Sequence, residues 1–110
     1  MCSSDLLASL LPRLEQGWHT FAPLRDQLPE SPTATARRLF YDTLVFDDAT
    51  LAQLVARFGD TQLLLGTDHP FNFQEREPVA RVQALGLSPA QTEALVAGNA
   101  RHFLGPRAWA

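Results

Sequence analysis

A carboxylate follows a short run of leucines in the second half of the chain. Residues 63–65 are all leucine, and Asp68 stands three positions after them. An unbroken apolar run of this kind is typical of a parallel strand buried on both faces. Side chains alternate along a strand, so Leu64, Gly66 and Asp68 share one face, and Gly66 is expected to leave room beside the carboxylate. Because parallel barrels build their active sites at the carboxyl ends of their strands, Asp68 is the candidate functional residue.

The residues around Asp68 allow further assignments. From spacing alone, Asp68 has the alternative role of capping its loop as an Asx turn before the following proline. His69 points to the opposite face, which predicts a place in a pocket wall or against a helix. Asp42 ends the preceding predicted strand, where a buried hydrogen bond to a neighbouring loop is favoured over catalysis. Phe71 and Phe73 are expected in the core or in a pocket wall.

A strand, helix, strand unit is predicted to position these residues. Residues 39–46 are rich in aromatic and β-branched side chains and predict a strand that stops at Asp47 and Asp48, which can cap the helix that follows. Residues 49–58 predict a helix with one apolar face, which Gly59 ends. With the strand at 63–65, the unit has about the ~30 residues that such a motif requires, and its strands should be parallel neighbours.

Helices are predicted on both sides of this unit, over residues 4–16, 18–28, 32–38, 78–85, 89–97 and 100–104. Ser31 and Ser88 each precede a proline and are expected to be N-caps. Gly17 and Gly98 are expected to end helices, and Asn99 to cap the last one. Only two strands emerge, and two parallel strands leave both edges unpaired. Their partners must come from further residues of the same protein or from other chains.

Composition narrows the possible partners. The 110 residues carry a net charge of −3 and are 45% hydrophobic, so no basic field exists for nucleic acid or anionic lipid. No apolar run approaches the ~20 residues needed to span a bilayer, and no targeting signal is recognisable, so a cytoplasmic location is expected. Cys2 is the one cysteine, which excludes an internal disulfide and a thiolate zinc site.

The N-terminus reads as a non-native start. Residues 1–6 spell MCSSDL, which a common sequencing-adapter sequence encodes when it is translated. We therefore interpret residues 1–6 as an assembly artefact. Residues 7–110 are interpreted as the C-terminal part of a larger domain that contains its last two strand and helix units.

Three strings in the sequence resemble a known family: FYDT at residues 40–43, LGTDHPF at 65–71 and GNARHFLG at 98–105. Over about residues 10–105 the chain resembles the C-terminal end of the amidohydrolase-related family typified by aminocarboxymuconate-semialdehyde decarboxylase. The resemblance implies an α/β fold, a (β/α)₈ TIM barrel of which this chain supplies strands seven and eight. It also implies a divalent metal, zinc or in some members manganese, at the carboxyl ends of the strands. Asp68 matches one metal ligand of the family, whose histidine ligands are absent from this sequence.

The family resemblance implies a hydrolase or decarboxylase for a small carboxylated or aromatic-derived substrate. A metal lowers the pKa of bound water, and an adjacent carboxylate such as Asp68 can accept its proton. Arg13 falls where related decarboxylases place an arginine that binds a substrate carboxylate, often across a subunit interface, so the intact protein is expected to be a homodimer. The alternative for Arg13 is a solvated helix arginine.

One aspartate cannot hold a catalytic metal, because such sites use about three protein ligands. The chain alone is therefore expected to be inactive and to retain no metal. The alternative function is a non-catalytic interaction module that completes the fold of a partner subunit.

Overall fold

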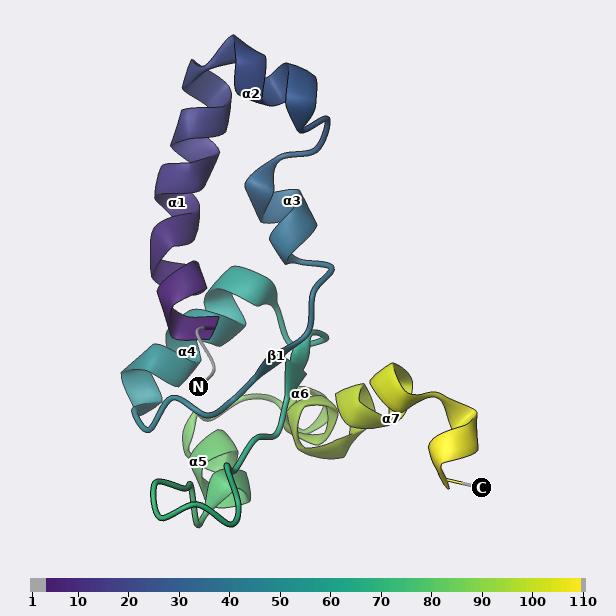
Figure 1. Ribbon diagram of the computed structural model, residues 1–110. Coiled ribbons are helices and arrows are strands. Elements are labelled where there is room, and N and C mark those ends of the chain that lie inside the picture. The colour runs from purple at the N-terminus through teal and green to yellow at the C-terminus, as the bar shows by residue number, and fades with distance from the viewer. Residues whose placement is uncertain (1–3, 110) are drawn as a thin grey trace.

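A two-stranded parallel sheet lies between an N-terminal group of helices and a C-terminal run of helices (Figure 1). The computed structural model describes residues 4–109. Strand β1 (Tyr41–Asp42) pairs with β2 (Leu63–Leu64), with Tyr41 opposite Leu63 and Asp42 opposite Leu64. Helix α4 (Asp48–Phe58) connects the two strands. The predicted strand, helix, strand unit and its parallel pairing are confirmed.

Local capping explains where α4 begins and ends. The Asp47 carboxylate accepts hydrogen bonds from the backbone N–H and the hydroxyl of Thr50, at 2.7 and 2.6 Å. These bonds, the hydroxyl bond first, lower the pKa of Asp47 below its usual value. At the other end Gly59 adopts a φ of 87°, a conformation that a side chain would disfavour. Both ends were predicted from the sequence, because each depends on adjacent residues only.

Strand β1 is shorter than the predicted range of 39–46. Leu39 lies in a turn, where its N–H donates to the Ala36 carbonyl at 3.2 Å. At the other end Phe46 has a φ of 55°, in the left-handed region, which no strand residue adopts. The strand prediction was therefore wrong at both ends, since the aromatic residues that favoured it lie partly in the flanking turns.

The core lies between the sheet and the helices that cover one of its faces. Tyr41 stacks on Phe58 with 3.8 Å between ring centroids, and its hydroxyl donates to the Ala36 carbonyl at 2.7 Å. Burial raises the pKa of Tyr41. Leu63 and Leu51 are fully buried beside this pair. The remaining buried apolar residues are Ala8, Leu11, Ala36, Leu54, Val82 and Leu95.

The N-terminal helices form a hairpin that projects from the sheet, as Figure 1 shows. They are α1 (Ser4–Thr20), α2 (Ala22–Gln27) and α3 (Pro32–Ala36). Gly17 does not end α1, because the helix continues to Thr20 and the Phe21 N–H donates to the Gly17 carbonyl at 2.9 Å. Trp18 therefore belongs to α1 rather than to the next helix. The N-cap predicted at Ser31 is confirmed by its 3.2 Å bond from the Ala34 N–H.

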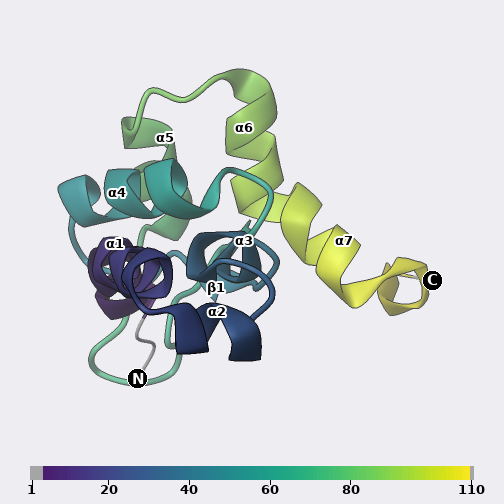
Figure 2. The same ribbon diagram turned by 90° about the horizontal axis from the view of Figure 1, so that it is seen from above.

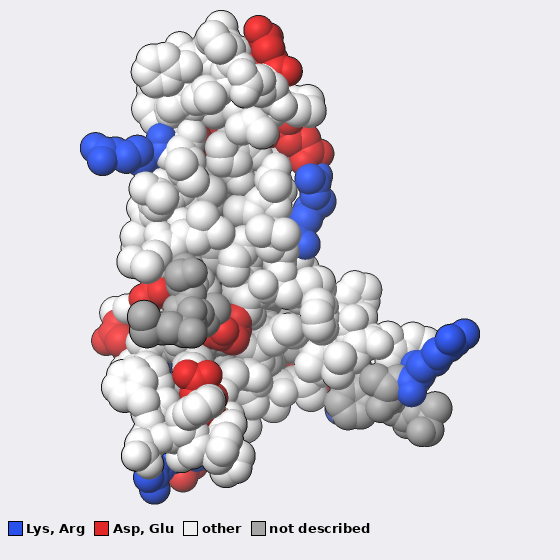
Figure 3. Space-filling model, viewed as in Figure 1, with Lys and Arg blue, Asp and Glu red and all other residues white. Residues whose placement is uncertain are grey.

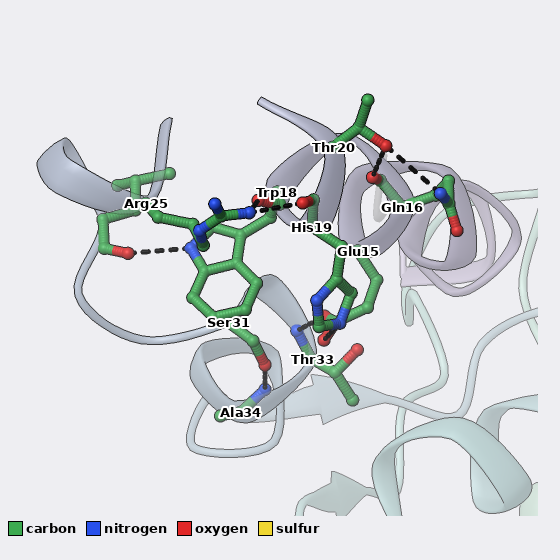
Figure 4. Close-up of polar contacts among 10 residues, drawn as sticks. Glu15, Gln16, Trp18, His19, Thr20, Arg25, Ser31, Thr33 and Ala34 are labelled. Atoms are coloured by element: carbon green, nitrogen blue, oxygen red, sulfur yellow. Dashed lines mark hydrogen bonds and ion pairs between the residues drawn. The ribbon is translucent and has the colours of Figure 1, made fainter. Parts of the chain in front are cut away.

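Polar contacts close the hairpin at its turn (Figure 4). Trp18 Nε1 donates to the Leu28 carbonyl at 2.8 Å, and Arg25 donates to the carbonyls of Trp18 and His19 at the end of α1. Glu15 accepts the Thr33 N–H at 2.9 Å, and hydrogen bonds from Thr33 lower the pKa of Glu15. These bonds fix the last turn of α1, which explains why Gly17 does not interrupt it.

An apolar groove of about 420 Å³ runs between the three helices of the hairpin. Its walls include Leu11, Leu14, Trp18, Leu24 and Leu28. On the face drawn in Figure 3, the middle of the hairpin surface is free of charged side chains, and blue and red side chains lie at its edges. Residues 4–109 leave this apolar surface uncovered.

The C-terminal run comprises α5 (Pro78–Ala84), α6 (Pro89–Glu93), a π-helical turn η1 (Ala94–Gly98), α7 (Asn99–Leu104) and a 3₁₀ turn η2 (Pro106–Trp109). Ser88 is the N-cap of α6, as predicted, and the structure adds a capping box in which the Gln91 side chain accepts from the Ser88 N–H. Gly98 and Asn99 are both helical, so the stop at Gly98 and the cap at Asn99 were wrong. Figure 2 shows α6 and α7 following one another along the edge of the molecule.

The Asn99 side chain joins the C-terminal helices to the sheet. Its amide nitrogen donates to the Leu63 carbonyl at 2.8 Å and to the Asp60 carbonyl at 2.7 Å. The residue is only 7% exposed. Its sequence position beside a glycine suggested a cap, whereas its partners lie 36 and 39 residues earlier in the chain. Within residues 4–109, no helix has both the length and the apolar character to cross a membrane.

Replacing Asn99 with alanine should lower the free energy of unfolding by about 2 kcal/mol, because it leaves buried carbonyls without a donor. Urea denaturation of the purified chain measures this change. Asn72→Ala is the control, since Asn72 is exposed in a loop and its loss should change stability by less than about 0.5 kcal/mol. Equal stability of the two variants would contradict the anchoring role of Asn99.

Candidate functional site

The two faces of the sheet differ in their covering. Tyr41 and Leu63 are buried against the helices, whereas their neighbours Asp42 and Leu64 are half-buried on the opposite face. Gly66 lies on the same face as Asp42 and Leu64. A Cβ atom added to Gly66 would lie 2.9 Å from the Cβ of Asp42. The space that Gly66 leaves is therefore filled by Asp42, which corrects the expectation that it lies open beside Asp68. Glycine is required here for the close approach of the two chains.

Asp42 has a local structural role. Its Oδ1 accepts the Leu44 N–H at 3.0 Å, in the turn directly after β1. Beside it, the Thr43 hydroxyl oxygen accepts the Gly66 N–H at 3.2 Å and extends the contact between the strands. Asp42 is thus half-buried and hydrogen-bonded within its own turn, and within residues 4–109 the predicted bond to a neighbouring loop is not formed.

Asp68 lies just beyond β2 in the left-handed conformation, with a φ of 55°. Its backbone carbonyl accepts the Phe71 N–H at 2.9 Å and closes the turn. Its side chain is exposed, and in the part of the chain that the structure describes the carboxylate has no hydrogen bond or ion pair. The Asx turn considered as an alternative is therefore not formed, and the carboxylate oxygens are available to a ligand.

Phe46 occupies the equivalent position after β1. Phe46 and Asp68 each stand four residues beyond the paired residues Asp42 and Leu64, and both have a φ of 55°. A left-handed conformation is unfavourable for a bulky side chain such as phenylalanine. Backbone strain of this kind gathers at functional sites, and here it marks the carboxyl ends of both strands.

Aromatic side chains from the two loops meet at this end of the sheet. The rings of Phe46 and Phe73 are 4.7 Å apart, and Phe73 is 73% exposed. Phe71 is 68% exposed, so neither Phe71 nor Phe73 belongs to the core. Sequence reasoning missed Phe46, which it placed inside a strand.

The loop that begins at Asp68 is closed at its base. The Glu75 N–H donates to the Thr67 carbonyl at 2.9 Å, and the His69 N–H donates to the Thr67 hydroxyl oxygen at 3.2 Å. The His69 Nδ1 atom lies 3.3 Å from Gln74 Oε1 across the loop. His69 lines an open surface pocket, which agrees with a pocket wall, and its exposure disagrees with a helix-facing position. The two ends of the loop formed by residues 68–74 therefore lie close together beside β2.

Glu75 fixes the returning end of the loop. Its carboxylate accepts the Glu77 N–H at 3.0 Å and pairs with Arg81 of α5 at 2.5 Å. The Glu77 N–H, and after it the Arg81 guanidinium, lower the pKa of Glu75. Arg81 also contacts Asp48 in the first turn of α4 at 2.7 Å. No periodic pattern connects these residues, so sequence reasoning missed both Glu75 and Arg81.

Asp68 supplies one donor of the kind that a divalent metal binds. Carboxylate oxygen suits zinc and manganese alike. Within residues 4–109, no three side chains of histidine, cysteine, aspartate or glutamate gather in a metal-binding arrangement. The described residues therefore supply one candidate metal ligand, Asp68, and not a complete metal site.

Arg13 lies elsewhere in the molecule. It is exposed on α1, which packs against α2, α3 and α4. From the sheet, α1 rises toward α2 and away from the loop that follows β2 (Figure 1). The structure therefore does not bring Arg13 to Asp68 within one chain.

Comparison with known proteins places the chain in a family. No family model matches it. Over 95 residues, or 84% of this chain, it is 33% identical to a 2-amino-3-carboxymuconate-6-semialdehyde decarboxylase from Dictyostelium discoideum. A crystal structure of an amidohydrolase from Mycobacterium avium subsp. paratuberculosis K-10 matches 88% of this chain, with a TM-score of 0.69 and 27% identity. The chain belongs to the amidohydrolase family.

Both relatives are much longer than the matched region. This amidohydrolase-family chain spans 26% of the decarboxylase and 24% of the solved amidohydrolase. Its parallel strands and flanking helices correspond to a C-terminal portion of the family's TIM barrel, which confirms the predicted family and fold class. In a barrel the face that carries Asp42, Leu64 and Gly66 is the interior one, because helices cover the other.

Replacing Gly66 with alanine should lower the free energy of unfolding by about 1 to 3 kcal/mol, because the new Cβ would push β1 away from β2. The matched control is Gly17→Ala. No atom lies within 4 Å of a Cβ at Gly17, and alanine in a helix should raise stability by about 1 kcal/mol. Thermal melts of the two variants measure both changes. Tolerance of alanine at both positions would contradict the close contact at Gly66.

Acidification should lower the free energy of unfolding, in part because Glu75 becomes protonated. Its pKa in the folded chain is below the ordinary 4.5, so its carboxylate stabilises the fold above pH 4.5. This contribution is lost as the pH falls through the lowered pKa. Urea midpoints measured between about pH 5 and pH 3 should therefore drop less in Glu75→Gln than in the unaltered chain. Glu93→Gln, at an exposed carboxylate beside Arg101, serves as the control.

Proposed function

We propose that this chain is the C-terminal part of a metal-dependent decarboxylase of the amidohydrolase family that acts on a small carboxylated substrate. The observation that carries the proposal is the Asp68 carboxylate, exposed and without an interaction in residues 4–109, at the carboxyl end of β2. The decarboxylase relative favours loss of carbon dioxide as the reaction. Hydrolysis is the second candidate, because the solved relative is described as an amidohydrolase.

In this proposal Asp68 is one ligand of a divalent metal, zinc first and manganese second. When bound, such a metal acidifies water and polarises oxygen atoms of the substrate. The other ligands would come from parts of the barrel that lie outside this sequence. The aromatic pair of Phe46 and Phe73 would border the substrate at the same end of the sheet. These roles favour an enzyme over the interaction module considered earlier.

Arg13 is proposed to bind a carboxylate of the substrate. A guanidinium presents a planar pair of donors that matches a carboxylate. Because Arg13 is exposed on a helix that leads away from Asp68, the carboxylate that it binds would belong to the site of a second subunit. The active assembly would then be a homodimer, in the cytoplasm, with a small molecule as its substrate.

A chimeric enzyme tests the role of Asp68. Residues 10–105 of this chain would replace the matching segment of the Dictyostelium decarboxylase, whose other parts supply the remaining barrel strands. The chimera should retain metal and decarboxylase activity, and Asp68→Asn should lower activity at least ~100-fold, because the metal loses a charged ligand. Metal content and steady-state rates measure both effects.

The control in the chimera is Asp60→Asn, which lies before β2 and should leave metal content and rate unchanged. Full metal content and activity in Asp68→Asn would refute the ligand role. A chimera that holds metal but hydrolyses an amide or lactone, without decarboxylation, would favour the second candidate.

A further inference from the structure

We propose that Arg81 is a positioning residue, which holds the loop of residues 67–75 in the shape that presents the Asp68 carboxylate. This inference rests on the proposed role of Asp68 in metal binding. It adds a residue outside the site, on α5, that acts on Asp68 through Glu75.

The loop has few other supports. Phe71 and Phe73 near its tip are 68% and 73% exposed, and the 4.7 Å ring contact of Phe73 joins the loop only to Phe46, which is itself exposed. Its base is closed by the backbone bond from Glu75 to Thr67, and its first turn by the bond from Phe71 to Asp68. The bond from Glu75 to Thr67 depends on where the returning end of the loop lies, and the side chain of Glu75 sets that position.

Asp68 needs such a support because its conformation is unfavourable. A φ of 55° is disfavoured in most residues other than glycine, and although aspartate adopts it more readily than most, its turn still has to be held in place. The turn that Asp68 forms with Phe71 lies between two fixed points, β2 on one side and Glu75 on the other. Release of Glu75 would let Asp68 relax to an ordinary conformation and turn its carboxylate.

Arg81 is placed to hold Glu75 against the body of the molecule. Its Nε lies 2.5 Å from Glu75 Oε2, and the two side chains are 25% and 12% exposed. A second nitrogen lies 2.7 Å from Asp48 of α4, whose side chain is 62% exposed. Exposed ion pairs contribute little, so the pair with Glu75 is the effective one and the contact with Asp48 is secondary.

The test uses the full chain without metal, studied by NMR. Two variants, Arg81→Met and Glu75→Gln, each remove the ion pair from one side. Exchange of the Phe71 and Glu75 amides should become roughly tenfold faster in both, as local opening of the loop becomes easier. The ¹³C shifts of Asp68 should lose their left-handed signature, while the amides of Tyr41 and Thr43 in the sheet keep their protection.

Two further variants serve as controls. Arg81→Lys keeps a cation beside Glu75 and should restore the protection of Phe71 and the shifts of Asp68. Arg101→Met removes an exposed ion pair with Glu93, at 2.9 Å, and should change none of these signals. Together they separate an effect of the Glu75 pair from a general effect of losing an arginine.

Unchanged exchange at Phe71 and Glu75 in Arg81→Met would overturn the proposal, as would a failure of lysine to restore it. Equal loss of protection at Tyr41 and Thr43 in both Arg81→Met and Glu75→Gln would also overturn it, because it would assign the pair a general structural role. A loss confined to the loop in Glu75→Gln supports it even if Arg81→Met unfolds. None of these measurements involves metal, so their outcome is independent of the chimera experiment.

Discussion

The backbone pairing of β1 with β2 is the constraint on which the rest of the structure depends. The N–H groups of Tyr41 and Thr43 donate to the carbonyls of Gln62 and Leu64, both at 2.9 Å. This register decides that Tyr41 and Leu63 face the helices, where they nucleate the core. It also brings Gly66 against Asp42 and aligns the loops after the two strands. Phe46 and Asp68 occupy equivalent positions after β1 and β2 because the register of the two strands is fixed.

Local signals in the sequence predicted the elements well. The caps at Ser31, Asp47 and Ser88 are bonds between residues three positions apart, so the sequence near each one is sufficient to predict it. The apolar face of residues 49–58 predicted helix α4, and the run of leucines at 63–65 predicted the parallel strand β2. Asp68 was singled out because its place after β2 and the family resemblance both point to it, and its metal-ligand role stays a prediction.

Features that depend on distant residues were missed or misassigned. Asn99 looks like a cap in sequence, but its amide reaches carbonyls 36 and 39 residues away. Arg81 joins a loop and two helices, and its contact with Asp48 spans 33 positions. Phe46 has the β propensity of a strand residue, yet the turn into α4 imposes a left-handed conformation on it. For Asn99 and Arg81 the deciding contacts are tertiary, whereas for Phe46 the adjacent turn outweighs the strand preference.

The Asn99 amide also decides how a sheet can grow beyond β2. The carbonyls of Gln62 and Leu64 point to β1, so the Leu63 carbonyl between them points to the outer edge, where Asn99 already donates to it. A strand added at this edge would find that acceptor engaged and would pair from Leu65 onward. Any strand that pairs at this edge would therefore be displaced toward the carboxyl end of β2. Such a stagger between neighbours is what allows a tilted sheet to close upon itself.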